Sequence, residues 1–405
     1  MKYILIIPDG MGDRPAKELG GKTPLESART PNMDYFARHG IVGLTQTIPR
    51  GFTPGTDIGS MSVFGYDPRK YFTGRGPLEA TVHGIDLGPK DLAFRCNLVT
   101  LDGSRLKDFS ADHISLGDAK VLIEAFDKIV QKKFDGKVKL YAGKGTGYRH
   151  LMVARNAPAA LCKVNCVPPH DIMGESYRAH LPKGQAADLL NELMALSREF
   201  LKNHAINLKR AQNGRGAANS IWLWGQGFPP SFPTYFCRFG FRGGVITAVD
   251  LLKGIAKHAG LDVIRVPGVT GYFDTNYVGK AEYAVNALRS RDFIAIHIES
   301  TDEAGHLGDA KLKIKAIEDV DRLVVGTLRK QLREFGSYKL LLLPDHFTCV
   351  ETRTHSSDLV PFLMYSSDKE KKGPKKFSEK SSKAAGLVVK EGHRLMDFFV
   401  GGKFD

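Results

Sequence analysis

Hydrophobic residues form three short continuous runs, and an acidic residue or a histidine follows each run. The runs are KYILIIP before Asp9, DFIAIHIES before Asp302, and YKLLLLP before Asp345 and His346. Such runs are typical of parallel strands that are buried on both faces. Helical patterns, including TPNMDYFARHG and AIEDVDRLVVGTLRKQLREFG, lie between them. The alternation predicts an α/β fold with a mainly parallel central sheet flanked by helices.

The middle of the chain follows a different pattern. The segment AFRCNLVTLDGSRLKDFSADHISLG contains hairpin-like runs around a DG turn. The apolar face of one amphipathic helix carries Leu189, Leu193, Leu196 and Phe200. A polar, glycine-containing stretch, LKRAQNGRGAANS, follows that helix. We therefore predict an inserted, smaller α+β domain over residues 86–217, and a discontinuous core over residues 1–85 and 218–405.

The length of 405 residues and the 42% hydrophobic content suffice for two sizeable cores. The first apolar run reaches Asp9 too soon for a signal peptide, and no later stretch approaches the roughly 20 apolar residues of a membrane span. The five cysteines are odd in number and scattered, which favours a reducing compartment. The sequence therefore predicts a cytoplasmic protein without a membrane partner.

The formal net charge of +14 raises the question of a nucleic-acid partner. No predicted helix carries a basic stripe, and aromatic and basic residues do not interleave as an RNA-binding sheet requires. Much of the excess lies in SSDKEKKGPKKFSEKSSK, which reads as a solvated surface loop. We expect no nucleic acid, and the remaining positive charge suits a small anionic substrate.

Three aspartates and three histidines at predicted strand ends are candidate metal ligands. Asp302 and His306 are four residues apart in STDEAGHLGD, which places both on one face of a helical turn. His355 follows His346 by nine residues, and Asp9 and Asp345 complete the set. Taken singly, such an aspartate is often a helix cap and such a histidine a core or surface residue. Together they suffice for two metals with nitrogen and oxygen ligands, for which manganese or zinc is better suited than calcium.

Two metals about 3.5 to 4 Å apart can stabilise an in-line phosphoryl transfer, which also needs a nucleophile. The stretch RGFTPGTDIGSMSVFGYDP offers Thr56 and Ser60. In the simplest alternative Thr56 only caps a helix and Ser60 fills a turn. If a helix begins near Asp57, Thr56 stands at its mouth, where backbone N–H groups favour phosphate. Ser60 would lie one turn inside and bond back to the carbonyl of residue 56, so position favours Thr56.

An ordered set of motifs resembles the archaeal type of cofactor-independent phosphoglycerate mutase, a member of the alkaline phosphatase superfamily. The motifs are IPDGMGDRPAKELGGKTPLESARTPNMD, PGTD, SVFGYDP, YFTGRGPLEA, DEAGHLGD and PDH with THSSDLVPF, and the match continues through FSEKSSKAAGLVVKEGHRLMDFF. The resemblance implies an alkaline phosphatase-like core with an inserted domain, two divalent metal ions and a phosphoenzyme. It also implies a phosphoglycerate substrate, a role in glycolysis, and no need for 2,3-bisphosphoglycerate. Manganese or zinc is expected, with magnesium or cobalt as alternatives.

The resemblance also assigns residues. One metal would be held by Asp302, His306 and His355, and the other by Asp9, Asp345, His346 and the nucleophile Thr56. Substrate-binding and acid-base candidates in the insert are Arg95, His113, Arg149 and His150, of which His113 and Arg149 would be catalytic. Lys280 is added from the core. For each of these five, the alternative is an ordinary surface cation or turn residue.

The sequence departs from the family pattern at the nucleophile. The usual motif is Gly-Ser-Asp, followed by two small residues and then often His or Asn, whereas this chain has Gly55-Thr56-Asp57 with Ser60 in the later position. Threonine serves as nucleophile elsewhere in the superfamily, so a phosphothreonine is expected. The alternatives are a phosphatase or a homoserine kinase-like phosphotransferase on the same metals, and a metal-bound but inactive binding protein.

Overall fold

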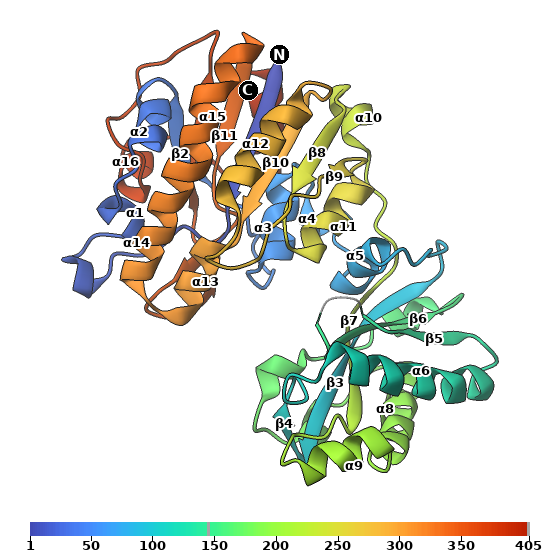
Figure 1. Ribbon diagram of the computed structural model, residues 1–405. Coiled ribbons are helices and arrows are strands. Elements are labelled where there is room, and N and C mark those ends of the chain that lie inside the picture. The colour runs from blue at the N-terminus through green and yellow to red at the C-terminus, as the bar shows by residue number, and fades with distance from the viewer. Residues whose placement is uncertain (144–145, 403–405) are drawn as a thin grey trace. The chain divides into compact units, whose positions relative to one another are not determined.

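The computed structural model describes residues 1–143 and 146–402, and the chain forms two compact units (Figure 1). Unit 1 comprises Met1–Phe72 and Ser231–Asp405, and unit 2 comprises Thr73–Pro230. Both ends of unit 2 thus lie outside the range 86–217 predicted for the insert. The reason is that helix α5 (Arg75–Val82) packs against strands β3 (Leu92–Asp102) and β7 (Ser220–Gly227), and that β7 pairs with β3. The hydrophobic pattern alone does not indicate this packing.

Unit 1 is built around an eight-stranded sheet with the order β15-β2-β14-β11-β1-β10-β8-β9. The strands are β1 (Lys2–Pro8), β2 (Ile41–Thr45), β8 (Gly243–Ile246), β9 (Asp262–Val263), β10 (Phe293–Ile298), β11 (Tyr338–Leu342), β14 (Val360–Ser366) and β15 (Val388–Val389). Strand β1 pairs in parallel with β10 and β11, and among the described strands of this sheet only the two pairings of β14 are antiparallel. The three apolar runs are therefore confirmed as adjacent, buried, parallel strands.

Helices flank this sheet, and α12, α14 and α15 cover the face turned toward the viewer in Figure 1. The main helices of unit 1 are α2 (Pro31–Arg38), α3 (Thr56–Val63), α11 (Asp250–His258), α12 (Tyr277–Leu288), α13 (Ser300–Leu307), α14 (Ala310–Asp319), α15 (Gly326–Gln331), α16 (Glu379–Ala384) and α17 (Leu395–Gly401). Both predicted helical patterns are confirmed. The second pattern also contains a π-helical stretch, Val320–Val325. The buried Asp321 in this stretch accepts the N–H groups of Asn32 and Met33 at the start of α2.

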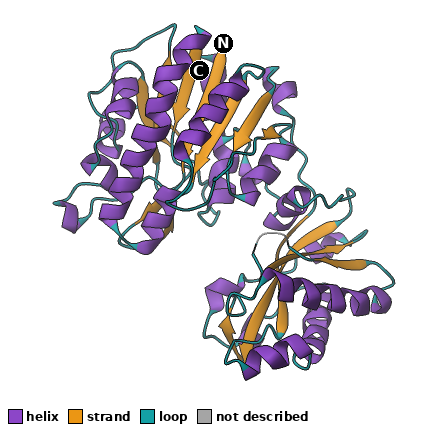
Figure 2. Ribbon diagram, viewed as in Figure 1, coloured by secondary structure: helices purple, strands orange, loops and turns teal. Residues whose placement is uncertain are grey.

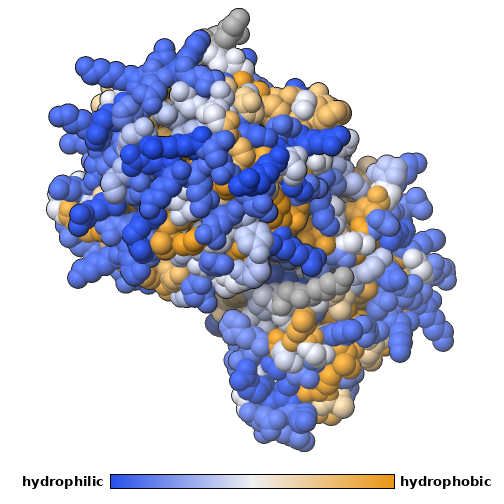
Figure 3. All heavy atoms as spheres, turned by 45° about the horizontal axis from the view of Figure 1, so that its top comes forward, coloured by the Kyte–Doolittle hydropathy of each residue, from blue (hydrophilic) through white to orange (hydrophobic). Residues whose placement is uncertain are grey.

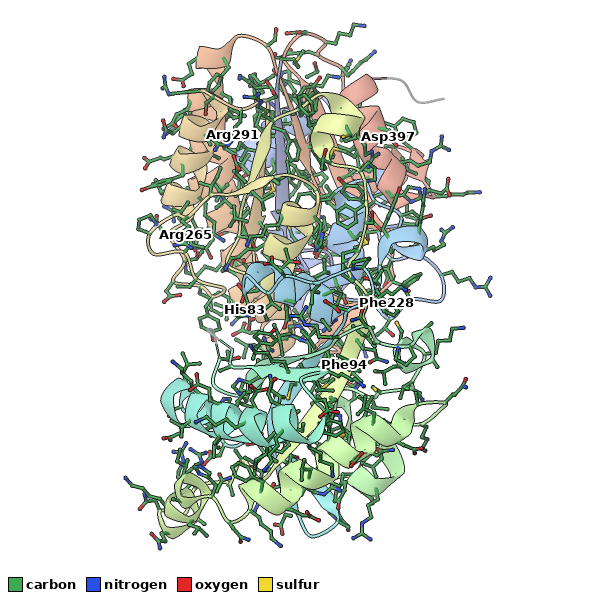
Figure 4. The ribbon with its side chains drawn as sticks, turned by 90° about the vertical axis from the view of Figure 1, so that its right-hand side faces the viewer. His83, Phe94, Phe228, Arg265, Arg291 and Asp397 are labelled. Carbon is green, nitrogen blue, oxygen red and sulfur yellow. The ribbon has the colours of Figure 1, made fainter. Side chains whose placement is uncertain are left out.

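Unit 2 contains a five-stranded antiparallel sheet in which β7 adds to the order β4-β3-β6-β5 by pairing with β3. Its main elements are β3 (Leu92–Asp102), β4 (Arg105–Asp108), α6 (Leu116–Lys133), β5 (Val138–Tyr141), β6 (Arg149–Ala154), α8 (Ala187–Leu201), α9 (Ala205–Gln212) and β7 (Ser220–Gly227). The DG turn joins β3 to β4, with Gly103 at φ 56°. Phe94 on β3 is fully buried in the core of this unit (Figure 4).

The fold class predicted from the sequence is confirmed: a mainly parallel α/β sheet flanked by helices, with a smaller α+β part (Figure 2). Hydrophilic residues predominate on the face shown in Figure 3. Among the described residues, no helix is long and apolar enough to cross a membrane. All five cysteines lie in the described part of the chain and are free thiols there.

Candidate functional site

The six candidate ligands of unit 1 come together because of the strand order. Asp9 directly follows β1, α13 follows β10, and Asp345 follows β11 after two intervening residues. Since β1 lies between β10 and β11 and all three run in parallel, their carboxyl ends meet at one edge of the sheet. His355 reaches the same place from the short strand β13 (Thr354–Ser356), which pairs with β12 (Phe347–Cys349).

The first group contains Asp302, His306 and His355. The Asp302 Oδ2 atom lies 3.2 Å from Nε2 of His306, one helical turn away on α13. Its Oδ1 atom lies 3.4 Å from Nε2 of His355, and the two Nε2 atoms are 2.9 Å apart. The predicted placement of Asp302 and His306 on one helical face is therefore what the structure has.

The second group contains Asp9, Asp345 and His346, all of them buried. His346 Nε2 lies 3.3 Å from Asp9 Oδ1 and 3.8 Å from Asp345 Oδ2. The Asp345 Oδ1 atom accepts the backbone N–H groups of Gly10 at 3.3 Å and of His346 at 3.1 Å, which fixes this carboxylate. The three residues offer ligand atoms that all lie within 4.8 Å of one another.

His346 connects the two groups. Its ligand atoms also lie within 4.8 Å of those of Asp302 and His355. The ring centroids of His346 and His355 are 4.1 Å apart. The structure thus gathers all six predicted ligands into one cluster with His346 at its centre.

The close packing of carboxylates and imidazoles shifts the pKa values of several residues in this cluster. Burial, and then repulsion from Asp345 and Asp302, raise the pKa of Asp9 well above its usual range. Burial alone would also raise the pKa of Asp302, but hydrogen bonds from His306 and His355 outweigh it, and the pKa of Asp302 lies well below normal. The bond to Asp302 in turn raises the pKa of His306 to about 9. His306 thus supplies positive charge beside Asp302, whereas burial lowers the pKa of His346.

The donor set fits two divalent cations. Asp9 Oδ1 is buried and has no hydrogen-bond partner among the described residues. A buried carboxylate oxygen without a partner is costly unless a cation or donor meets it. Three carboxylates and three imidazoles form the mixed oxygen and nitrogen environment that suits manganese or zinc.

Thr56 is the first residue of α3, and Gly55 is the N-cap without a side-chain cap. The alternative in which Thr56 only caps the helix is therefore wrong. Its Oγ1 atom lies 3.3 Å from Nε2 of His346. The prediction for Ser60 is also wrong: its buried hydroxyl donates to Asp345 Oδ2 at 3.1 Å and not to the carbonyl of residue 56, because the ligand-bearing loop after β11 packs directly on α3.

Unit 2 holds all of the substrate-binding candidates except Lys280, which lies in unit 1. Arg95 on β3 is buried, pairs with Glu79 at 2.6 Å, and lies 4.5 Å from the ring centroid of Trp224. Arg149 is exposed at the start of β6 and lies 5.3 Å from the ring centroid of Tyr148. Strands β3 and β6 are paired, with Asn97 opposite Arg149. Two arginines are thus carried on neighbouring strands.

His113 is exposed and sits in an unusual backbone conformation. Ala111, Asp112 and His113 have φ values of 50°, 54° and 47°, which is the left-handed region. Such a run is strained and persists only where neighbouring contacts hold it. Asp108 accepts the N–H of Asp112, and Arg210 donates to the carbonyl of Ala111 at 2.7 Å. The surrounding structure therefore fixes the segment that carries His113.

His150 and Lys280 are both buried, whereas a cation that contacts the substrate has to be accessible to it. His150 is buried, its Nδ1 accepts the N–H of Gly143 at 3.0 Å, and burial lowers its pKa to about 4, so it is neutral near pH 7. The Lys280 ammonium is fully buried and donates to Glu299 at 2.8 Å and to the carbonyl of His297 at 2.7 Å. We correct both assignments: neither residue presents a cation to a bound anion.

Sequence reasoning missed the residues that support the ligands. Thr348 donates to Asp302 and lies 3.2 Å from Nδ1 of His346, so it contacts both ligand groups. His297 Nε2 lies 3.2 Å from Asp9 Oδ2, and His297 Nδ1 lies 3.1 Å from Glu299. The sequence could have indicated His297 and Glu299, because these two polar residues alternate with apolar ones within the run DFIAIHIES.

The half-buried Glu379 also supports the loop after β1. Glu379 accepts the N–H of Asp13 at 3.2 Å and the hydroxyl of Thr23 at 2.7 Å. Burial outweighs these hydrogen bonds and raises the pKa of Glu379 from 4.5 to about 7. Since the folded pKa exceeds the unfolded one, its contribution to stability is full below the unfolded value and is lost as pH rises through about 7.

We therefore expect the free energy of unfolding of the wild-type chain to fall by about 2.5 kcal/mol more than that of Glu379→Gln between about pH 5 and pH 8. The glutamine imitates the protonated carboxyl, so it removes the titration while it keeps both contacts. Urea unfolding of the two proteins across this range measures the difference. Parallel stability curves would contradict the expectation.

Comparisons with known proteins identify the family of this chain. The family model of 2,3-bisphosphoglycerate-independent phosphoglycerate mutase matches residues 37–207. A relative from Geobacter sulfurreducens, named a probable enzyme of that kind, is 48% identical over 99% of this chain and 100% of its own. A solved protein of Pyrococcus horikoshii has a TM-score of 0.81 and 32% identity, and covers 100% of this chain and 98% of its own.

A solved cofactor-independent phosphoglycerate mutase from Thermoplasma acidophilum has a TM-score of 0.67 and 28% identity, covering 99% of each chain. The similarity in sequence to the Geobacter relative extends over 99% of this chain and therefore includes both units. This chain therefore belongs to the 2,3-bisphosphoglycerate-independent phosphoglycerate mutases, which are isomerases.

Proposed function

We propose that this chain is a metal-dependent mutase that interconverts 3-phosphoglycerate and 2-phosphoglycerate through a phosphothreonine, as a step of glycolysis and gluconeogenesis. One observation carries the proposal: Thr56 Oγ1 lies 3.3 Å from Nε2 of His346, a residue of the second ligand group that also lies beside Asp302 and His355. The first N–H groups of α3, where Thr56 stands, favour a phosphoryl group at the same place.

Asp302, His306 and His355 would hold one divalent ion, and Asp9, Asp345, His346 and Thr56 the other. When bound, such ions promote loss of the hydroxyl proton and neutralise charge on the transferring phosphoryl group. Ser60 would keep Asp345 in place through its 3.1 Å hydrogen bond. Thr348 would orient Asp302 and His346 together.

In the first half-reaction the Thr56 oxygen attacks phosphorus, its bond to phosphorus forms, and the bond from phosphorus to the 3-oxygen of the substrate breaks. One proton passes overall from the Thr56 hydroxyl to the departing 3-oxygen, and His113 of unit 2 would be the acid-base group for that transfer. In the second half-reaction the 2-hydroxyl of glycerate attacks the phosphothreonine and gives its proton to His113. The bond between phosphorus and Thr56 breaks, the Thr56 oxygen regains a proton, and no water is consumed.

Unit 2 would bind the substrate. Arg149 is exposed and offers donors to a carboxylate, whereas Arg95 is buried beside Glu79 and would support the strand that pairs with the one carrying Arg149. Glycerate must remain bound while it turns, since its release would leave the phosphoenzyme to be hydrolysed. The aromatic faces of Trp224 and Tyr148 support the two guanidinium groups during that step.

Removal of metal is expected to abolish mutase activity reversibly. The metal-stripped chain should form 2-phosphoglycerate from 3-phosphoglycerate, without added 2,3-bisphosphoglycerate, only after manganese or zinc is returned, with magnesium and cobalt tested beside them. A coupled assay measures the product, and a phosphate assay runs in parallel. Release of phosphate without 2-phosphoglycerate would indicate a phosphatase, and phosphorylation of homoserine by a nucleotide would indicate a kinase-like enzyme; either result would contradict the proposal.

A further inference from the structure

A chain of three buried charged residues leads from helix α12 to Asp9. Lys280 and His297 have 0% exposure, and Glu299 has 4%. Lys280 Nζ lies 2.8 Å from Glu299 Oε2, the other oxygen of Glu299 lies 3.1 Å from Nδ1 of His297, and His297 Nε2 lies 3.2 Å from Asp9 Oδ2. Positive and negative groups thus alternate from the helix to the carboxylate.

Further contacts fix the middle of the chain. Glu299 Oε1 accepts the N–H of Ala248 at 3.0 Å and lies 3.3 Å from the hydroxyl of Thr247. The same hydroxyl lies 3.2 Å from Nδ1 of His297. Lys280 also donates to the carbonyl of His297 at 2.7 Å, so it holds both the backbone and the partner of this histidine. The imidazole therefore has one fixed place between two carboxylates.

Stability alone is a weak reason for such a network. Desolvation of four charged groups costs about as much as their attraction returns, and well-packed apolar residues of similar volume are often as stable or more so. The network instead has a directional effect on Asp9. Its Oδ2 atom faces His297, so Oδ1 is left to face Nε2 of His346 at 3.3 Å, within the second ligand group.

We propose that His297, held by Glu299 and Lys280, is a positioning residue that aims Asp9 Oδ1 at the second divalent ion and so sets the affinity for that ion. The inference rests on the metal site of the proposed function. It reassigns Lys280 from substrate binding to the support of a ligand. Outer partners of metal ligands typically affect affinity about 10- to 100-fold.

Calorimetric titration of the metal-stripped protein with Mn²⁺ tests this. Asp345→Asn and Asp302→Asn first identify which of the two binding events belongs to which group. Two variants are then compared with the wild type: Lys280→Met, and the charge-neutral double variant Lys280→Met with Glu299→Gln. In both, the Mn²⁺ affinity of the second group, whose binding event is absent in Asp345→Asn, should fall by about 10- to 100-fold. The Mn²⁺ affinity of the first group, whose binding event is absent in Asp302→Asn, should change by less than about threefold.

The double variant guards against misfolding, because it leaves no unpaired buried charge. Circular dichroism and urea unfolding of the metal-free proteins check its fold. Unchanged Mn²⁺ affinity in folded variants, equal weakening of both events, or failure of both variants to fold would each overturn the positioning role. A wild-type chain that binds no Mn²⁺ would instead contradict the metal site of the proposed function, so the two failures are distinguishable.

Discussion

Thr56→Ala is expected to lower kcat by at least about 10⁴-fold, because it removes the oxygen that receives the phosphoryl group. The helix should still form, since the N-cap is Gly55 and the threonine side chain makes no cap hydrogen bond. Thr56→Ser should remain active, because the hydroxyl is kept and loss of the methyl group frees the side chain and its approach to phosphorus. Steady-state mutase assays on the two variants measure these effects.

Ser60→Ala is the matched control for the second hydroxyl of the same helix. Its hydroxyl donates to Asp345 Oδ2, so the alanine removes one support of a ligand and not a reacting group. We expect a loss well below that of Thr56→Ala, which excess metal partly restores. Near-normal turnover of Thr56→Ala together with an inactive Ser60→Ala would reverse the assignment of the nucleophile.

His346→Ala should have the second large effect. The wild-type chain is expected to bind two divalent ions, and the imidazole of His346 lies beside ligand atoms of both groups. Its removal should lower activity by more than about 100-fold, beyond what the loss of an outer partner costs. Elemental analysis at saturating metal should find fewer than two ions in the folded variant.

His306→Ala should lose activity through the first group alone, since His306 lies beside Asp302 and His355. His39→Ala is the control, because this ring lies against Tyr35 at the end of α2 and should leave activity unchanged. No more than one ion in the wild-type chain, or full activity in both ligand variants, would contradict the two-metal account.

Local pattern was enough to predict the centre of the fold. The apolar runs at β1, β10 and β11 contain few polar interruptions, and a parallel sheet is the structure that buries such strands on both faces. Their order, with β1 in the middle, then brings Asp9, Asp302 and Asp345 to one edge. The helical spacing of Asp302 and His306 was equally readable, because four residues make about one turn.

Residues whose role depends on tertiary packing were not predictable in this way. Lys280 follows a glycine in a polar stretch and reads as a surface cation, but α12 packs on β10 and carries its ammonium to Glu299. His150 precedes a continuous apolar run on β6, and its burial, which lowers its pKa to about 4, depends on how unit 2 packs around that strand. Ser60 donates to Asp345, which is 285 residues away in the chain, and no local pattern predicts that contact.

The most direct test of the account is the position of the phosphoryl group on the enzyme. Metal-loaded protein is mixed with 3-phosphoglycerate, denatured within the first turnovers, digested and mapped by mass spectrometry, with the Thr56→Ala variant treated in parallel. We expect one phosphate, on Thr56 of the peptide that contains PGTDIGSMSVFGYDP, and none in the variant. Phosphate on Ser60, or 2-phosphoglycerate formed at a normal rate by a variant that cannot be phosphorylated at residue 56, would contradict it.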